Sequence, residues 1–583
     1  MEYLNRFKST VSSVAAQVTQ ALPGNPIFRE YELHKQIATA GPGLSWKIYS
    51  GIKYTTKQAV AIWVFEKKQV ERWPKHERET FPEILKKGIS QLTRLRHPRL
   101  LIVEHALEES RDSYAFCTEP IFASLANVFG NTENISPSPE HLKDFKLVDI
   151  EIRHGLFQLG EALSFLHLAN MLHGNLCPSS IIINDKGNWK LAGFDFCITG
   201  TSTPNGKATF EATEWDRRVL SIMNPELDYS APELVTAVKV DVYADMYSIG
   251  VLAFSVFNDY KPIFENKNML DNFNKNIDKL KQLPLNLFAK IPDIFRDDVK
   301  ACLNVTPELR PNATQFTKIN YFDDPLIKTL NFLDSLMQMD NTQKMQFFKG
   351  LPQLLEKFTK RPLLQKVLPY LTAEFSTPEL IPFILPSIFL IAEQATSNEF
   401  SEVIFPPLIP VFAMNRPYQI VLTMLQKMPL LLQKTPEGDI RRYVLPLVYG
   451  AISNDNMKIQ ELCLAIIPTI GKLVDRDAMR SQLLPKLLKL SLEGTVLSFE
   501  MVPCKSKTKH KPKTKSKPKP KPKPKPKPKT KPKPKTKPKP KPKPKTKTKP
   551  KPKTKPMTKP KPKPKSKSKP KAKPKLKPKT AQA

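Results

Sequence analysis

The chain has 583 residues and a formal net charge of +37, an excess typical of proteins that bind nucleic acid or anionic surfaces. Of the 92 basic residues, 37 are lysines from Lys505 onward, where no acidic residue occurs, so the first 504 residues carry 55 basic and 55 acidic side chains. This neutral body gives no sign of a specific nucleic-acid site, and it is long enough for about two to four domains.

The cysteines and the hydrophobic runs indicate a cytoplasmic protein. The six cysteines are scattered, without the paired spacing of a disulfide framework or a zinc site, so we expect no bound metal and a reducing compartment. The most apolar run, residues 380–392, has 13 residues and contains Pro382 and Pro386, whereas a membrane span needs about 20. We expect neither a transmembrane segment nor a cleavable signal.

Residues 1–27 are predicted to form an amphipathic helix and its end. Within residues 1–22 the apolar side chains recur every three or four positions and therefore share one helix face; they are Leu4, Phe7, Val11, Val14, Val18 and Leu22. The breakers in residues 23–26 end the helix. Such a helix packs on its own protein, the commoner arrangement, or makes a peripheral contact with a membrane.

Residues 28–325 are predicted to form an α+β domain with two lobes. Short β-rich runs gather early in this region and longer helical runs follow, which favours a small sheet lobe and a larger helical lobe. The β-rich runs are residues 59–65, 114–119, 181–184 and 189–192.

Residues 326–500 are predicted to form an all-α solenoid. Helical segments are punctuated by units in which a proline stands between apolar residues. Four of these prolines, Pro369, Pro406, Pro446 and Pro485, are 37, 40 and 39 residues apart. That period is close to the ~40–47 residues of HEAT-type repeats, which stack because one helical hairpin cannot cover its own apolar face. About four repeats are expected.

Residues 501–583 alternate Lys with Pro and are predicted to be disordered, because this composition cannot bury apolar surface. The repeat pattern stops at Gly494 without a capping repeat, so we expect a truncated or alternatively spliced form of a longer repeat protein. An alternative function is that the polycationic segment binds RNA, microtubules or anionic lipid without specificity and in a salt-dependent way.

Three motifs in residues 28–325 resemble those that hold the protein kinase fold together. Ala231-Pro232-Glu233 matches the A-P-E motif, and Asp245 begins a run similar to D-x-W-S-x-G. Arg310 stands where kinases place the arginine that pairs with the A-P-E glutamate. We expect Glu233 and Arg310 to form a buried ion pair.

The catalytic positions of the kinase signature are all substituted. Trp63 replaces the strand lysine, and Gly88 falls where the helix glutamate should be. Asn175 replaces the general-base aspartate, Ser180 the metal-binding asparagine, and Gly193 the aspartate of D-F-G. Phosphoryl transfer depends on positioning and charge stabilisation by these groups. The sequence therefore predicts a catalytically inactive domain in which binding of ATP and magnesium is not expected.

Four other residues are weak candidates for residual nucleotide binding. Gly41 and Gly43 are the glycines left in a degraded phosphate loop, interrupted by Pro42, which has no backbone N–H to offer a phosphate. Lys47 on the next strand could point into the cleft, without the usual partner glutamate, and Asp195 lies two residues beyond the lost metal ligand. An atypical serine/threonine kinase using Lys47 and Asp195 is thus the enzyme alternative.

A degenerate kinase domain followed by a helical solenoid resembles the Scy-like family of amino-terminal-kinase-like proteins. The likeness rests on residues 173–175 and 193–195, and on residues 92–100, 122–127 and 347–352, which are similar to members associated with coated vesicles. It implies a non-catalytic scaffold or adaptor that binds clathrin and adaptor-complex proteins. It also implies a peripheral location on the Golgi, endosomes and clathrin-coated vesicles, with traffic between these and the plasma membrane.

Overall fold

The computed structural model describes residues 24–137, 139–202, 208–454, 456–471, 473–474 and 476–492. The helix expected in residues 1–22 and the Lys-Pro segment of residues 501–583 lie outside the described residues. Within the described ranges, no helix is both long enough and apolar enough to cross a membrane.

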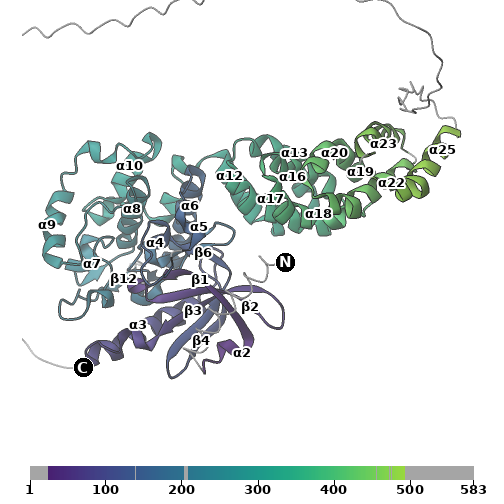
Figure 1. Ribbon diagram of the computed structural model, residues 1–583. Helices are drawn as coiled ribbons and strands as arrows, with labels where there is room; N and C mark the ends of the chain where they lie inside the picture. Colours follow the sequence, from purple (N-terminus) through teal and green to yellow (C-terminus); the bar gives the residue numbers. More distant parts are fainter. Residues whose placement is uncertain are drawn as a thin grey trace, which may run out of the picture. The chain divides into compact units, whose positions relative to one another are not determined.

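The small lobe is built on one five-stranded antiparallel sheet (Figure 1). In spatial order its strands are β1 (Tyr31–Ala40), β2 (Trp46–Lys53), β3 (Ala59–Glu66), β5 (Ser113–Thr118) and β4 (Val103–Glu109). Both faces of this sheet are covered, which explains why β3 and β5 are almost continuously apolar.

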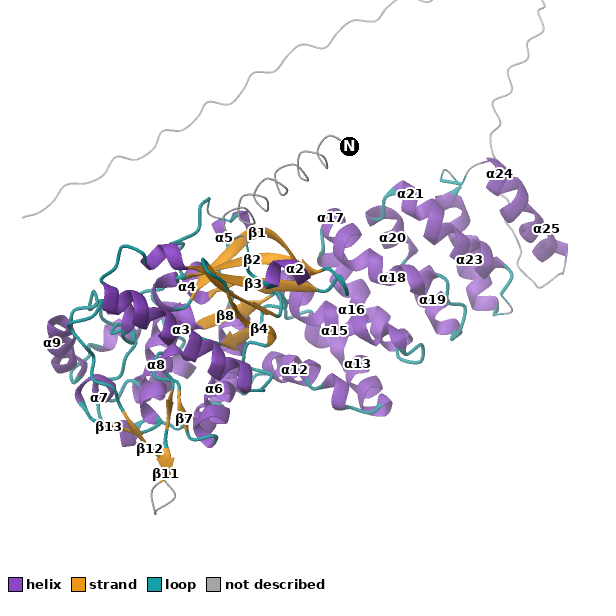
Figure 2. Cartoon of the chain, turned by 90° about the horizontal axis from the view of Figure 1, so that it is seen from below, coloured by secondary structure: helices purple, strands orange, loops and turns teal. Residues whose placement is uncertain are grey.

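The alternation of side chains along β3 divides this lobe between two cores. Ala61, Trp63 and Phe65 face the main core, to which the long helix α3 (Lys75–Arg94) contributes Phe81 and other buried side chains. The residues between them belong to a smaller cluster that includes Ile27 of the short helix α2 (Ile27–Glu30). Figure 2 shows α2 lying against the strands.

The large lobe is mainly helical, as predicted. Its central helix α8 (Tyr243–Phe257) is buried at 13 of its 15 residues, because other elements surround it. The remaining helices are α4 (Leu125–Val128), α5 (Glu140–Lys143), α6 (Asp149–Leu168), α7 (Pro232–Thr236), α9 (Leu270–Leu280), α10 (Asp293–Cys302) and α11 (Ala313–Phe316). The strands are β6 (Ile121–Ser124), β7 (Met171–Leu172), β8 (Ile181–Asn184), β9 (Trp189–Leu191), β10 (Ile198–Thr199), β11 (Thr201–Ser202), β12 (Ala208–Glu211) and β13 (Lys239–Val240).

A second hydrophobic core begins where the kinase-like core ends. The main core extends to Phe322, and the second runs from Ile327 to Leu483, with Ile150 of α6 as its one member from the large lobe. The second core lies within α12 (Pro325–Asp334) and the helical array that follows. The predicted order of an α+β kinase-like domain and an all-α solenoid is confirmed.

The solenoid consists of helical hairpins. The first helices of the hairpins are α13 (Asn341–Leu355), α16 (Ile381–Gln394), α19 (Tyr418–Gln426) with α20 (Met428–Lys434), and α23 (Met457–Ile470). The second helices are composite: α14 (Lys360–Pro362) with α15 (Leu368–Ala373), α17 (Ser397–Glu399) with α18 (Phe405–Phe412), α21 (Glu437–Asp439) with α22 (Leu445–Ile452), and α24 (Arg476–Ala478) with α25 (Leu484–Leu492). Helix α13 contacts α16, α16 contacts α19, and α19 contacts α23, so the first helices stack in a row (Figure 1).

The regularly spaced prolines lie inside helices rather than between them, contrary to the idea that they punctuate the array. In each composite helix a five-residue π-helical segment joins the two α-helical parts, and the proline follows it by two residues. A proline has no N–H to donate, and its ring clashes with the carbonyl four residues earlier. A wider π turn just before the proline relieves this conflict, so the helix continues.

Candidate functional site

Trp63 stands at the lysine position and fills the inner part of the cleft with its aromatic side chain. Its side chain is buried, and its indole Nε1 donates a hydrogen bond to Oγ1 of Thr118 at 2.9 Å. The ring stacks on Phe116, with centroids 5.1 Å apart, and meets Trp46 edge to face at 6.5 Å. The strand that would present a cation to phosphate instead contributes an aromatic cluster to the core.

Gly88 allows α3 to pack directly on the segment after the D-F-G position. A Cβ at Gly88 would lie 2.5 Å from Oδ1 of Asp195, a residue of the 3-10 helix η4 (Phe194–Phe196). Real Cβ atoms do not approach other atoms so closely. The glutamate that kinases place here is therefore incompatible with this position of α3.

Asp195 is buried and its carboxyl group tends to be neutral. Burial raises its pKa to about 7, against a smaller lowering by the charge of Lys87. Magnesium is held by ionised carboxylates. Sequence reasoning offered Asp195 as a substitute metal ligand, but its surroundings disfavour the charged form that this role needs.

Gly193 and Ser180 lie against each other. Gly193 has a φ of +70°, and a Cβ there would lie 2.5 Å from Cβ of Ser180. The Ser180 hydroxyl donates to the carbonyl of Cys177 at 2.8 Å and accepts from its N–H at 3.1 Å. Both metal-ligand positions are thus taken up by close packing and local hydrogen bonds.

Asn175, at the general-base position, holds two segments of the large lobe together. Its Oδ1 accepts a hydrogen bond from the backbone N–H of Glu226 at 2.9 Å, and the residue is buried. An amide is not a base at neutral pH, so this contact is one of positioning.

The glycine segment is closed onto the large lobe. Gly41 donates its backbone N–H to the carbonyl of Ser179 at 3.0 Å, and Nδ2 of Asn134 donates to the carbonyl of Leu44 at 3.1 Å. A Cβ at Gly43 would lie 2.2 Å from Ile222. The N–H of Gly41, which a phosphate-binding loop would offer to its ligand, is already bonded within the protein.

Lys47 does not supply the missing cation. Its Nζ lies 2.7 Å from Oε1 of Glu66 at the end of β3, so it is paired with a glutamate of the sheet and not with the usual helix glutamate, whose place Gly88 takes. The pairing follows from the register, which sets Lys47 opposite Val64, two residues from Glu66.

The space left beside Trp63, in the inner part of the cleft, is small. The cavity bounded by Trp63, Gly88, Gly193 and Asp195 measures about 20 Å³. That is about enough for one water molecule, whereas ligand pockets typically measure ~300–1,000 Å³. Among the described residues, no group of three or more His, Cys, Asp or Glu side chains is placed to hold a metal ion.

The residues that frame the kinase fold are in their expected positions. Arg310 donates to both carboxylate oxygens of Glu233 and to the carbonyl of Tyr243. Asp245 accepts hydrogen bonds from the backbone N–H groups of His173 at 2.9 Å and Gly174 at 3.0 Å. Burial raises the pKa of Asp245, but His167, His173 and the backbone N–H of Gly174 together outweigh it, so this pKa lies below its usual range.

A network of buried charges joins the large lobe to the first solenoid repeat, and sequence reasoning missed it. Glu151 of α6 is buried and accepts hydrogen bonds from Arg361, one of them at 2.8 Å from Nε. Arg99 bridges Glu161 of α6 at 2.7 Å and Asp334 of α12. The charges come from segments up to 235 residues apart in sequence, so no local pattern could reveal them.

Lys366 lies at the centre of this junction. It is 2% exposed, and its Nζ lies 3.1 Å from Nδ1 of His154 and 3.2 Å from Oδ1 of Asn188. Burial lowers its pKa to about 8, although Glu151 and Asp334 oppose the shift. The only sequence signal is the charge itself. Lys366 stands three residues before the repeat proline, where the three later repeats have the uncharged residues Val403, Tyr443 and Gln482.

Comparison of the sequence with known proteins places the chain in a family. Residues 31–322 match the family described as "Protein kinase domain". The chain is 48% identical over 499 residues to human SCY1-like protein 2, which covers 85% of this chain and 54% of that protein. The chain belongs to the Scy1-like family of proteins with a kinase domain. A further Scy1-like relative is protein kinase domain-containing protein ppk32 of Schizosaccharomyces pombe, 30% identical over 480 residues (79% of this chain, 62% of the relative).

One Scy1-like relative has a name that addresses activity. The Dictyostelium discoideum protein, 26% identical over 426 residues (72% of this chain, 45% of the relative), is called probable inactive serine/threonine-protein kinase scy1. This supports the assignment of the domain to a pseudokinase family. The chain spans about half the length of the curated relatives it matches.

Proposed function

We propose that this chain is a non-catalytic scaffold of the Scy1-like family, acting through protein contacts of its pseudokinase domain and its solenoid. The observation that carries the proposal is the closed cleft, in which the Trp63 side chain and the Gly88–Asp195 contact occupy the place of the phosphate clamp. A kinase must bind a magnesium nucleotide before it can position a phosphoryl group. The residues present do not fit that group.

The alternative of a weak kinase has less support. It requires Lys47 to leave Glu66 and the Asp195 carboxyl to ionise beside α3, and both changes would still leave no base at Asn175. The cleft would also have to open at the Gly41–Ser179 hydrogen bond. Each step costs free energy, and binding of a nucleotide would have to offset all of them.

The junction supports a scaffold whose two parts act together. Buried ion pairs depend on good geometry, because removing one partner leaves an uncompensated charge in the protein interior. Glu151–Arg361 and Arg99–Asp334 therefore favour one arrangement of α6 against the first repeat. Solenoids usually bind partners along an extended surface of stacked repeats, and this junction would hold such a surface in register with the pseudokinase domain.

By resemblance to the family, we propose that the partners are clathrin and adaptor-complex proteins, and that the protein works in the cytoplasm on the Golgi, endosomes and clathrin-coated vesicles. Affinity capture of the full chain from cytosol, followed by identification of bound proteins, tests this proposal. Enrichment of coat and adaptor proteins is expected. Their absence, with other proteins recovered instead, would reject the trafficking role and leave the scaffold proposal standing.

Titration with ATP and magnesium tests the loss of nucleotide binding. A ligand at 100 times its dissociation constant stabilises a protein by about 2.7 kcal/mol, which thermal unfolding detects readily. We expect no change in melting temperature up to millimolar ATP, with or without magnesium. A saturable increase that requires magnesium would overturn the inactive assignment and revive the enzyme alternative.

A further inference from the structure

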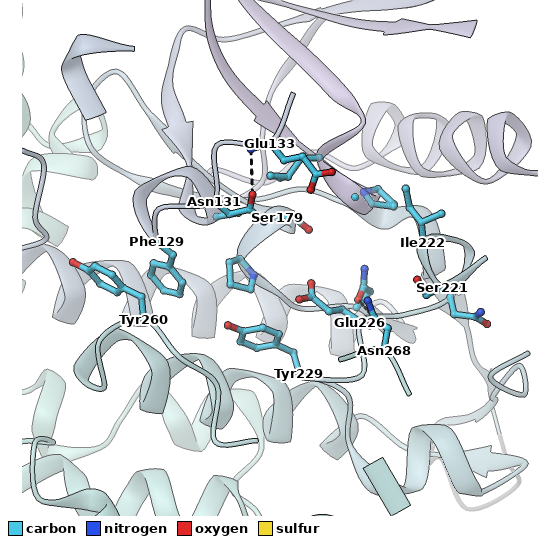
Figure 3. Close-up of a pocket in the computed structure, with 17 residues that line it drawn as sticks. Phe129, Asn131, Glu133, Ser179, Ser221, Ile222, Glu226, Tyr229, Tyr260 and Asn268 are labelled. Atoms are coloured by element: carbon cyan, nitrogen blue, oxygen red, sulfur yellow. Dashed lines mark hydrogen bonds between the residues drawn. The ribbon is translucent and has the colours of Figure 1, made fainter. Parts of the chain in front are cut away.

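A second cavity, of about 390 Å³, lies beside the closed cleft (Figure 3). Five segments surround it: Pro42–Leu44 of the glycine segment, the stretch after β6, the loop around Pro178, the stretch before α7, and the stretch between α8 and α9. Its volume is at the small end of the usual range for ligand pockets. The segments come from both lobes, so the closure that removes the nucleotide cleft also forms this cavity.

The lining of the cavity suits a cation. Its charged residues are the two acids Glu133 and Glu226, and none of the described residues that line it is Lys, Arg or His. Three aromatic rings complete it, those of Phe129, Tyr229 and Tyr260. Ammonium groups bind to the faces of aromatic rings and to carboxylates, most strongly where water is partly excluded.

The aromatic end of the cavity is preorganised. The rings of Phe129 and Tyr260 stack with centroids 4.6 Å apart and planes within 14° of parallel. Tyr260 has a φ of +62°, which is uncommon for a bulky residue, so the turn holds the ring in place at some cost in backbone energy. Figure 3 shows Glu226 and Tyr229 on one side of the cavity and Glu133 on the opposite side.

Glu226 lacks a charged partner in the described part of the chain. Its carboxyl group interacts with the thiol of Cys177, and no Lys, Arg or His among the described residues forms an ion pair with it. Burial, together with the charge of Asp228, raises its pKa to about 7. A carboxyl group in such surroundings gains free energy when a cation binds beside it.

We propose that this cavity is a binding site for a lysine-rich extended peptide, and that its occupant comes from the Lys-Pro segment of this same chain, from Lys505 onward. The segment combines two properties that suit the cavity, an extended backbone and regularly spaced ammonium groups. Alternating prolines favour the extended polyproline II form, which aromatic-lined grooves recognise at low entropic cost. The intervening lysines supply ammonium groups opposite Glu226 and Glu133.

The length of the segment does not limit this contact. At about 3.1 Å per residue, the 79 residues from Lys505 onward could extend about 240 Å. The repetition of Lys-Pro also offers many equivalent registers, so a modest affinity at one site is multiplied by the number of lysines that can enter it.

A peptide of residues 517–528, six Lys-Pro pairs, is the probe. Residues 1–497 form a compact unit that contains every described contact, so a chain ending at Leu497 is a suitable receptor without its own segment. Fluorescence anisotropy at physiological salt should show saturable binding of the labelled peptide to this receptor. The full chain should bind it at least about tenfold more weakly, because its own segment competes.

Matched variants identify the site. Glu226→Gln in the 1–497 receptor should weaken peptide binding at least about tenfold, since it removes the partly buried carboxylate. Glu402→Gln makes the same change in charge on the exposed face of the solenoid and should leave binding unchanged. If Glu226→Gln lowers the melting temperature, Glu133→Gln is used in its place as the cavity variant, and it should also weaken peptide binding.

Three results would overturn the proposal. Equal weakening by the cavity variants and Glu402→Gln would mean unspecific attraction of a polycation. No binding to the 1–497 receptor would mean that the cavity takes no basic peptide. Equal affinity of the full chain and the receptor, with the Glu226 dependence retained, would mean that the site serves a basic peptide from another protein and that this chain's own segment is not its occupant.

Discussion

The closed cleft and the solenoid junction differ in how they treat charge. In the cleft, a lysine, a glutamate and metal-binding side chains have been exchanged for tryptophan, glycine and serine, and the space is filled by apolar contact and local hydrogen bonds. At the junction, Arg99, Glu151 and Lys366 are buried or nearly so, and each has a partner. A region that no longer carries catalytic residues can pack like an ordinary hydrophobic core. A region that fixes the arrangement of two domains keeps buried charged groups, although their desolvation costs free energy.

The largest expected effect comes from breaking the junction on one side. Arg361→Ala removes the cation that hydrogen-bonds the buried Glu151 carboxylate, and breaking a buried ion pair on one side costs about 3–5 kcal/mol of unfolding free energy. Amide hydrogen exchange in α6 and in residues 360–373 should rise accordingly. The exposed pair of Arg441 and Glu437 is the control, and Arg441→Ala should cost less than about 0.5 kcal/mol. Similar effects of the two variants would show that the junction is no more stabilising than a surface ion pair.

The titration of Asp195 gives the second effect. The pKa of its carboxyl group is about 7 in the folded protein and near 3.8 in the unfolded chain. Between pH 4 and 7 the carboxyl group is therefore protonated in the folded protein and ionised in the unfolded chain. The stability that this group contributes is fully present below pH 4 and is lost as the pH rises to 7. Asp195→Asn removes this dependence. Relative to the parent, the variant should gain up to about 4 kcal/mol between pH 4 and 7, measured by denaturant unfolding at several pH values. A difference that does not vary with pH would contradict the buried, neutral carboxyl.

The smallest expected change in stability comes from replacing glycines in two long helices, and its sign should differ between them. Gly88→Ala places a methyl group against Asp195 and should cost about 1–3 kcal/mol, because α3 must move away from η4. Gly350 in α13 has open space at its Cβ position, so Gly350→Ala should stabilise the helix by up to about 1 kcal/mol. Thermal unfolding of the two variants measures both signs. Stabilisation by Gly88→Ala would show that the close packing of α3 is not required.

Sequence reasoning identified the large features because each has a local signature. The period of the prolines predicted the repeats, and the motifs around Glu233, Asp245 and Arg310 predicted the kinase-like fold. Substitution of the catalytic residues was legible position by position. Sequence reasoning did not foresee the partner of Lys47, because Glu66 is 19 residues away and the pairing is set by strand register. It also placed the prolines between helices, because the π turns that accommodate them have no marked composition.

The sequence by itself determined the fold class, the order of the domains and the absence of the catalytic groups, because hydrophobic periodicity, turn residues and motif positions are properties of short stretches. Tertiary structure decided what replaced the lost chemistry. The Gly88–Asp195 contact, the Gly41–Ser179 bond and the Arg99–Asp334 ion pair at the junction each join segments more than 100 residues apart. Their distances and burial exist only once the chain has folded, since long-range packing sets both the space around a side chain and the cost of its charge.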